Sequence, residues 1–264
     1  MGCAGSEREG SSGSGKQSLS NKPKVELALS EETLGALLPI AVYWTYSALY
    51  VLLGSLSSLD KYRLHPRGDE AKNIVSRATV VKGVLVQQAF QVVVALGLFT
   101  GPTLRHWSSG SMGRGMGVLD TWQYFMHRYM HVNKFLYKHV HSKDHTLVGL
   151  ILDTVGGALS FLVSGMSARD GIFFFSSATI KTVDDHCGLW LPGNPLHALF
   201  GNNSAYHDIH HQLYGSKCNF SQPFFVAWDR IMGTYMPYTL EKEGRKTRAS
   251  DVALVIIFLM TLSS

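Results

Sequence analysis

The sequence predicts an all-α integral membrane protein in which transmembrane helices are joined to a His-rich helical domain. Residues 33–59 contain no charged side chain, and a second uncharged run covers residues 83–104. Each run is long enough for a helix to cross a bilayer core, which takes about 20 residues. Ten of the 12 histidines fall between His127 and His211, so imidazole chemistry is concentrated in the middle of the chain.

The composition excludes several other classes of protein. The chain has 264 residues, of which 45% are apolar and 16% are charged, so it is too apolar for a disordered protein. Its three widely spaced cysteines cannot form a disulfide framework. The net charge of +5 does not by itself indicate a nucleic-acid partner, because acidic membrane surfaces attract Lys and Arg equally well.

Residues 1–33 are predicted to form a disordered N-terminal tail, because their first part is mostly Gly, Ser and charged residues with little to bury. The first six residues fit the N-myristoylation pattern on Gly2, and Cys3 is placed for palmitoylation. A Gly/Ser-rich tail produces such a match easily, so lipidation stays an open alternative.

Residues 34–104 are expected to contain two transmembrane helices. The first lies in the uncharged run 33–59. The second carries Gln87, Gln88 and Gln91, which must face another helix or the headgroups rather than lipid. Lys and Arg are equally frequent after each run, so the positive-inside rule does not indicate the orientation.

Residues 105–240 are expected to form one domain that includes a membrane hairpin over residues 146–180. This apolar region is too long for one pass and short for two, and it is interrupted at Ala168 and Arg169. A hairpin returns the chain to the side it left, so the histidines before and after it share one compartment. Residues 241–264 are predicted to be a C-terminal tail, because the apolar stretch 252–262 is too short to span.

The histidines show metal-ligand spacing. His127 and His131 are four residues apart, which places both rings on one face of a helix. Neutral imidazole binds Fe, Zn, Cu and Ni, and the scarcity of cysteine argues against thiolate sites. The histidines that we assign to such a site are His127, His131, His141, His145, His186, His207, His210 and His211.

Eight converging ligands are more than one metal ion needs, so the pattern indicates two. Iron suits an oxygen-using enzyme, because iron changes oxidation state and activates O₂ whereas zinc does not. His65, His106 and His197 lie outside the spacing and are interpreted as incidental. His139 is one residue off the spacing of its cluster and stays unassigned.

Three strings resemble the fatty acid hydroxylase (sterol desaturase) superfamily, and within it most closely its plant-type sphinganine C-4 hydroxylases. The strings are LDTWQYFMHRYMH over residues 119–131, KTVDDHCGLW over 181–190 and YHDIHHQLYG over 206–215. The resemblance covers about residues 34–240. It implies a first His box at His127 and His131, a second at His141 and His145, and a last box at 207–211, with His186 between.

The resemblance also implies cofactors, partners and a location. These are two iron ions at a cytosolic site, on a multi-pass protein of the endoplasmic reticulum membrane. NADPH would be the indirect electron source, through a separate cytochrome b5 and its reductase, and a homodimer is left open. Catalytic residues beyond the metal ligands stay unassigned, although Asp185 and Asp208 are expected to orient ligand rings.

The chain departs from the family pattern in two places. Asp144 stands where the second box has a histidine, and we count it among the candidate metal ligands because a carboxylate can bind iron. After His145 the family continues through a segment that contains an Asn-His-Pro string, which is absent here. The C-terminal residues 252–264 also lack the polar ending of the family.

Two functions follow from the resemblance, and a third follows from Asp144 and the absent segment. The first is a lipid monooxygenase, most directly a sphinganine C-4 hydroxylase of sphingolipid biosynthesis. The second is a very-long-chain aldehyde deformylating oxygenase (aldehyde decarbonylase) of wax and alkane synthesis, which uses the same His boxes. The third is an inactive membrane partner of an intact paralogue.

Overall fold

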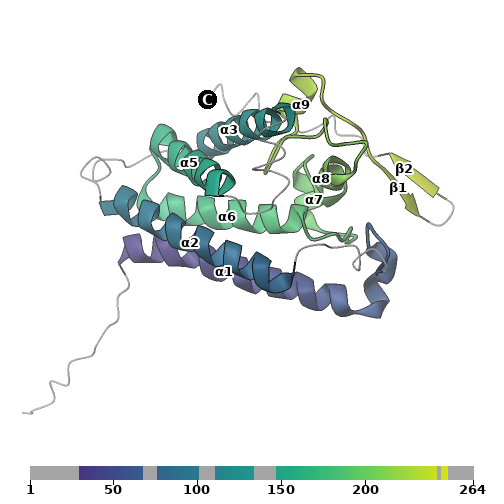
Figure 1. The fold of residues 1–264 in the computed structure, drawn as a ribbon, viewed down its shortest axis with the longest axis horizontal. Coiled ribbons are helices and arrows are strands. Elements are labelled where there is room, and N and C mark those ends of the chain that lie inside the picture. Colours follow the sequence, from purple (N-terminus) through teal and green to yellow (C-terminus); the bar gives the residue numbers. More distant parts are fainter. Residues whose placement is uncertain (1–29, 68–75, 101–110, 134–146, 243–244, 249–264) are drawn as a thin grey trace, which may run out of the picture.

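The part of the chain that the structure describes is mostly helical, as predicted (Figure 1). The computed structural model describes residues 30–67, 76–100, 111–133, 147–242 and 245–248. Five long helices make up most of this part: α1 Glu31–Ser55, α2 Arg77–Thr100, α3 Met112–Val132, α5 Leu147–Ser164 and α6 Ala168–Asp185. Three short helices follow them: α7 Pro195–Leu199, α8 Ser204–His211 and α9 Ala227–Ile231.

Helices α1 and α2 are long and apolar enough to cross a membrane. Only 6% of the apolar window of α1 and 11% of that of α2 are buried, so neither is the core helix of a soluble protein. Leucines and valines instead project outward, as they do where a helix faces lipid. Helix α1 starts at Glu31, inside the predicted tail, because Ser30 caps it and two glutamates favour its first turn.

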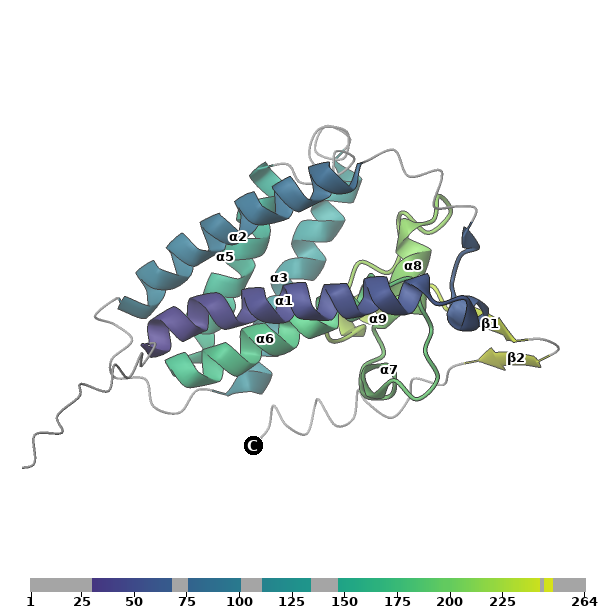
Figure 2. The same cartoon turned by 90° about the horizontal axis from the view of Figure 1, so that it is seen from below.

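Helix α6 runs parallel to α1, as Figures 1 and 2 show. Near their beginnings, Arg169 Nε donates to Glu31 Oε1 at 2.6 Å. Near their ends, the Tyr50 hydroxyl donates to Asp184 Oδ1. Helix α2 is antiparallel to α1: Phe99 packs on Gly35, and Trp44 Nε1 donates to Gln88 Oε1 at 2.9 Å. One glutamine of α2 thus faces another helix, as expected.

Helices α5 and α6 follow each other directly in the region of the predicted membrane hairpin, which itself stays a prediction. The chain reverses at 165–167, slightly before the expected position, because Ser167 and Asp170 form a capping box that starts α6. The two arms diverge: α5 packs along α3 and α6 along α1. Aromatic side chains, among them Phe99, Phe161 and Phe174, fill the space between these layers.

The segment after α6 packs against the end of the bundle where α3 ends (Figure 2). Asp120 of α3 accepts hydrogen bonds from the backbone N–H groups of Phe224 at 3.1 Å and Phe225 at 2.6 Å. Strands β1 Thr239–Lys242 and β2 Arg245–Arg248 pair antiparallel, so part of the predicted C-terminal tail is a β-hairpin. Gly2, Cys3 and residues 252–262 lie outside the described residues.

The parallel course of α1 and α6 predicts the topology of the N-terminus. Ser30 lies at the end of α1 opposite His186, so a membrane-crossing α1 separates the two by the bilayer. We expect that, in sealed microsomes, protease removes either a tag fused before Ser30 or a tag inserted at Ser57–Tyr62, but not both. Equal cleavage or equal protection of the two tags would contradict a membrane-spanning α1.

Candidate metal centre

Helix α8 supplies three histidines that point in two directions. Asn203 caps the helix, with its side-chain oxygen accepting from the N–H of Tyr206 at 3.0 Å. His207 and His211 are one turn apart and share a face, whereas His210 lies on the adjoining face. Two groups of histidines therefore meet on α8.

The first group consists of His127, His131 and His210. Its three ligand nitrogens lie within 4.8 Å of one another. His131 Nε2 is 3.0 Å from His210 Nε2, and the ring centroids of His127 and His210 are 4.4 Å apart. His131 precedes α5 and α6 and His210 follows them, so histidines that are far apart in the sequence lie together in the structure.

The second group consists of His186, His207 and His211, again with ligand nitrogens within 4.8 Å of one another. His186 caps the C-terminus of α6, and its Nε2 lies 3.0 Å from His207 Nε2. The rings of His207 and His210 are 5.7 Å apart, so the two groups adjoin through α8. Six of the predicted ligands are thus gathered in two triads.

Backbone carbonyls orient three of these rings. The Nδ1 atoms of His127, His186 and His210 lie 3.1, 2.8 and 2.7 Å from the carbonyl oxygens of Phe220, Thr182 and Cys218. A carbonyl only accepts, so each Nδ1 carries the proton and each Nε2 presents a lone pair to its group. This is the outer-shell arrangement that prepares a histidine to bind a metal.

A buried aspartate holds the loop that carries two of these carbonyls. Asp229 of α9 accepts from the backbone N–H groups of Phe220 at 3.0 Å and Ser221 at 2.7 Å. It also accepts from the hydroxyls of Tyr206 at 2.7 Å and Thr234 at 2.6 Å. Asp229 therefore ties the loop to α8 from outside the two groups.

The chemistry of the donors fits a metal such as iron. Desolvation lowers the pKa of His186. For His207, desolvation and repulsion from neighbouring imidazoles together lower the pKa well below its usual value. Neutral rings are the form that binds metal. Neither group includes a cysteine, so no described thiolate competes with the imidazoles there. Six imidazoles remain as the described donor set.

The sequence did not predict the partners of His197. This ring is buried, with Nε2 3.2 Å from Asp184 Oδ2, and it stacks on Trp190. Asn194 Nδ2 donates to Asp184 Oδ1 at 2.7 Å, and Tyr50 of α1 donates to the same atom. The network fixes the end of α6 two residues before His186. The residues of this network have no regular spacing in the sequence, so no sequence pattern predicts the network.

The two carboxylates expected to orient ligand rings do something else. Asp185 is buried and pairs with Lys181 one turn earlier on α6. Asp208 lies 2.8 Å from His65 Nε2 and also accepts from Gln212 at 3.4 Å. The expectation for both residues is therefore wrong within the described part of the chain, where backbone carbonyls rather than these carboxylates lie at Nδ1 of His127, His186 and His210. His65, expected to be incidental, bonds Asp208.

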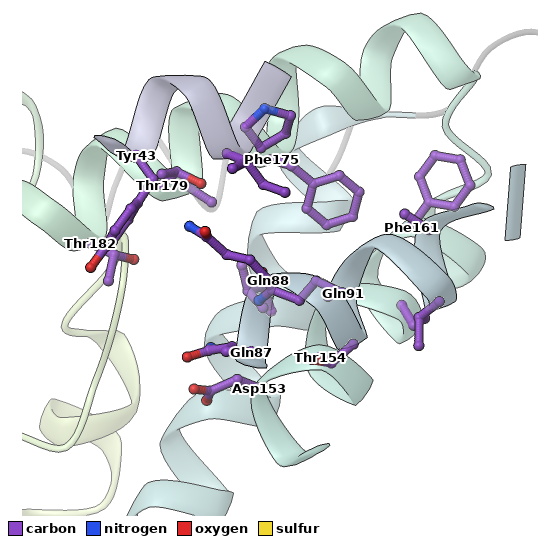
Figure 3. A pocket seen from close by; sticks show the side chains of 18 of the residues that line it. Tyr43, Gln87, Gln88, Gln91, Asp153, Thr154, Phe161, Phe175, Thr179 and Thr182 are labelled. Atoms are coloured by element: carbon purple, nitrogen blue, oxygen red, sulfur yellow. The ribbon is translucent and has the colours of Figure 1, made fainter. Parts of the chain in front are cut away.

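A cavity of about 470 Å³ lies between α1, α2, α3, α5 and α6 and reaches His186. Its far end is apolar, where Gly35, Phe99 and Phe161 meet. Polar side chains line its near end. In Figure 3, Gln87, Asp153, Thr179 and Thr182 lie on one side of the view and Phe161 lies on the other. The cavity is thus an amphipathic space between the two candidate membrane helices and helices α3, α5 and α6, and it reaches one histidine of the second group.

Comparison with known proteins shows to which family the chain belongs. The fatty acid hydroxylase family model matches residues 113–234, which contain both histidine groups. Sphinganine C4-monooxygenase 2 of Arabidopsis thaliana is 57% identical over 258 residues, covering 87% of this chain and 98% of the relative. This chain belongs to the fatty acid hydroxylase family. The family is one of His-rich, iron-dependent oxygenases.

Two further relatives of this fatty acid hydroxylase are sphinganine C4-monooxygenase 1 of A. thaliana and the very-long-chain aldehyde decarbonylase GL1-9 of Oryza sativa. The first is 62% identical over 241 residues, covering 81% of this chain and 92% of the relative. The second is 51% identical over 245 residues, covering 82% of this chain and 94% of the relative. No solved structure matches the chain.

The alignment with sphinganine C4-monooxygenase 2 bears on the absent segment of this hydroxylase. The alignment extends over 258 positions, but it includes only 87% of the 264 residues of this chain. Because 87% of 264 is fewer than 258, some aligned positions hold residues of the relative that this chain lacks. The expected place of the gap is directly after His145. His139, His141, Asp144 and His145 lie outside the described residues, so a second His box stays a prediction.

Proposed function

We propose that this protein is a membrane-bound, iron-dependent monooxygenase that hydroxylates carbon 4 of sphinganine. The observation that carries the proposal is the cavity that begins among apolar side chains of the membrane helices and ends at His186. A long alkyl chain already dissolved in the bilayer fits the apolar part and reaches the histidine end. Identities of 57% and 62% to two sphinganine C4-monooxygenases support this choice of substrate.

His127, His131 and His210 would hold one iron, and His186, His207 and His211 a second. Bound iron supplies the one-electron and O₂ chemistry needed to insert one oxygen atom into an unactivated C–H bond. The carbonyls of Phe220, Thr182 and Cys218 keep the Nε2 lone pairs of three ligands directed inward. The aromatic side chains around the cavity exclude water from the alkyl chain.

The remaining parts of the proposal concern the predicted second box, the partners and the location. His141, Asp144 and His145 would complete the metal ligands. Two electrons per turnover would come from NADPH through a separate cytochrome b5 and its reductase. The protein would lie in the endoplasmic reticulum membrane, through residues 34–104 and the hairpin 146–180, with the histidines of the 105–240 domain facing the cytosol. A homodimer is compatible with this arrangement.

Expression in cells that lack their own C4-hydroxylase tests the proposal. We expect mass spectrometry of the sphingoid bases to detect a trihydroxy base only when the protein is present, because no other enzyme supplies the 4-hydroxyl group. A matched variant, His207→Ala, removes one ligand from the buried centre of α8 and should give no product. Absence of the trihydroxy base with iron-loaded wild-type protein would contradict the proposal.

The 51% identity to an aldehyde decarbonylase supports a second candidate activity. The same histidines and cavity would serve an aldehyde, so hydrocarbons should be analysed from the same cells. New alkanes without trihydroxy bases would transfer the assignment to aldehyde deformylation. If neither trihydroxy bases nor alkanes form and the protein binds little iron, the result would support the role of an inactive membrane partner.

A further inference from the structure

We propose that Asp153, together with Gln123, binds the ammonium group of a long-chain base and so sets which carbon faces the histidine groups. The inference rests on the proposed function and deepens it, because it requires a substrate with a free, protonated amine. Asp153 would be a substrate-binding residue that determines specificity rather than a metal ligand. Neither histidine group includes it.

Asp153 is an unusual residue in its surroundings. It is the only charged residue of α5, whose other residues are apolar, small or hydroxyl-bearing. Its side chain is accessible rather than packed because it lines the cavity. A carboxylate among membrane helices is costly unless a cation or several donors compensate it, and such a residue usually marks a binding site.

The described residues around Asp153 leave its charge without a counter-ion. Its one hydrogen bond there comes from Gln123 Nε2, 3.3 Å from Oδ1. No described Lys or Arg forms an ion pair with it, and none lines the cavity. Asp153 is also the only acidic residue among the described residues of the cavity wall. The cavity therefore offers one anionic position that a cationic ligand would neutralise.

The position of this pair relative to the histidines matches the chemistry of carbon 4. Gln123 lies one helical turn before His127 on α3, a rise of about 6 Å along the helix. Thr182, also on the cavity wall, lies one turn before His186 on α6. In sphinganine the amine is on carbon 2, three bonds from carbon 4. An amine held at Asp153 thus keeps carbon 4 close to the histidines.

The rest of the cavity suits the rest of such a molecule. Gln87, Thr179 and Thr182 can donate to and accept from the two hydroxyl groups of a sphingoid base. The alkyl chain would extend toward Phe99 and Phe161. An aldehyde has no cation for Asp153, and a base with its amine acylated has lost its charge. The site should therefore discriminate the free base from both.

Equilibrium binding to the purified, iron-loaded protein in lipid nanodiscs tests the inference. The probes are sphinganine and uncharged N-acetylsphinganine, which share the chain and both hydroxyls. We expect the wild type to bind sphinganine about 10- to 100-fold more tightly, as for a hydrogen bond to a charged group. Asp153→Asn should remove most of this difference while iron content is retained, and Asp153→Glu should restore part of it. Asp60→Asn, which removes a surface carboxylate, is the matched control.

Equal affinity of the wild type for the two probes would overturn the inference, and this result does not depend on any variant folding. Unchanged discrimination in a folded Asp153→Asn variant would overturn it too. Either result would leave the C4-hydroxylase assignment intact if trihydroxy bases still form in cells. Conversely, ammonium-dependent binding without any trihydroxy product would support the amine site and reject the proposed reaction.

Discussion

Alanine in place of His131 is expected to lower formation of the trihydroxy base by at least about 100-fold. Loss of a residue that only hydrogen-bonds to a metal ligand costs about 10–100-fold in metal affinity or activity. His131 belongs to the first triad itself, so its loss should cost at least as much. About one of the two proposed irons should be lost, because the second triad contains no residue of α3. Product analysis in cells and the iron content of the purified variant measure the two effects.

His186→Ala provides the complementary experiment on the second triad and should give the same loss of product and of about one iron. His65→Ala serves as the control, since His65 is half-exposed and bonds Asp208 rather than joining a triad. Full activity in His131→Ala would contradict a role for the first triad. Loss of all iron in both variants would instead indicate that the two triads bind metal as one unit.

Asparagine in place of Asp229 is expected to destabilise the protein by about 3 kcal/mol or more. The asparagine amide would face buried N–H or O–H donors, and each unsatisfied buried group costs about 1–3 kcal/mol. The loop at Phe220 would also loosen, which frees His127 from its carbonyl partner. We therefore expect a lower midpoint of thermal unfolding in detergent and about 10- to 100-fold weaker iron binding.

Two matched variants separate the parts of this effect. Tyr206→Phe removes one of the donors to Asp229 and should cost about 1 kcal/mol. Asp60→Asn removes a surface carboxylate paired with Arg63 and Arg67, which contributes little to stability. If Asp229→Asn unfolds at the wild-type temperature and retains its iron, Asp229 does not organise the metal centre.

Much of the fold could be predicted because it depends on local patterns. Uncharged runs of 27 and 22 residues indicated α1 and α2. The spacing of His207, His210 and His211 placed rings on adjoining faces of one helix, and α8 has that form. The apolar region 146–180 is too long for one pass and short for two, which indicated a break near Ala168, and α6 begins there. These inferences need only helix geometry and the thickness of a bilayer.

The organisation around the histidines could not be predicted, because it depends on tertiary contacts without periodicity. Nothing in the spacing of Asp229 shows that it holds the loop behind His127. The buried pair of His197 and Asp184 likewise joins residues from separate helices. Asp185 and Asp208 were expected to orient ligand rings, but their side chains pair with Lys181 and His65 instead. The cavity at Asp153 is lined by five helices, so it depends on how all five pack together.

The iron content of the purified full-length protein tests the central claim most directly. We expect elemental analysis of the wild type, loaded and then freed of loosely bound metal, to give about two irons per chain, one for each triad of histidines. Retention of the iron should fall together with product formation in His131→Ala and His186→Ala. Iron far below one per chain in folded wild-type protein would contradict an oxygenase and indicate a partner without a catalytic metal.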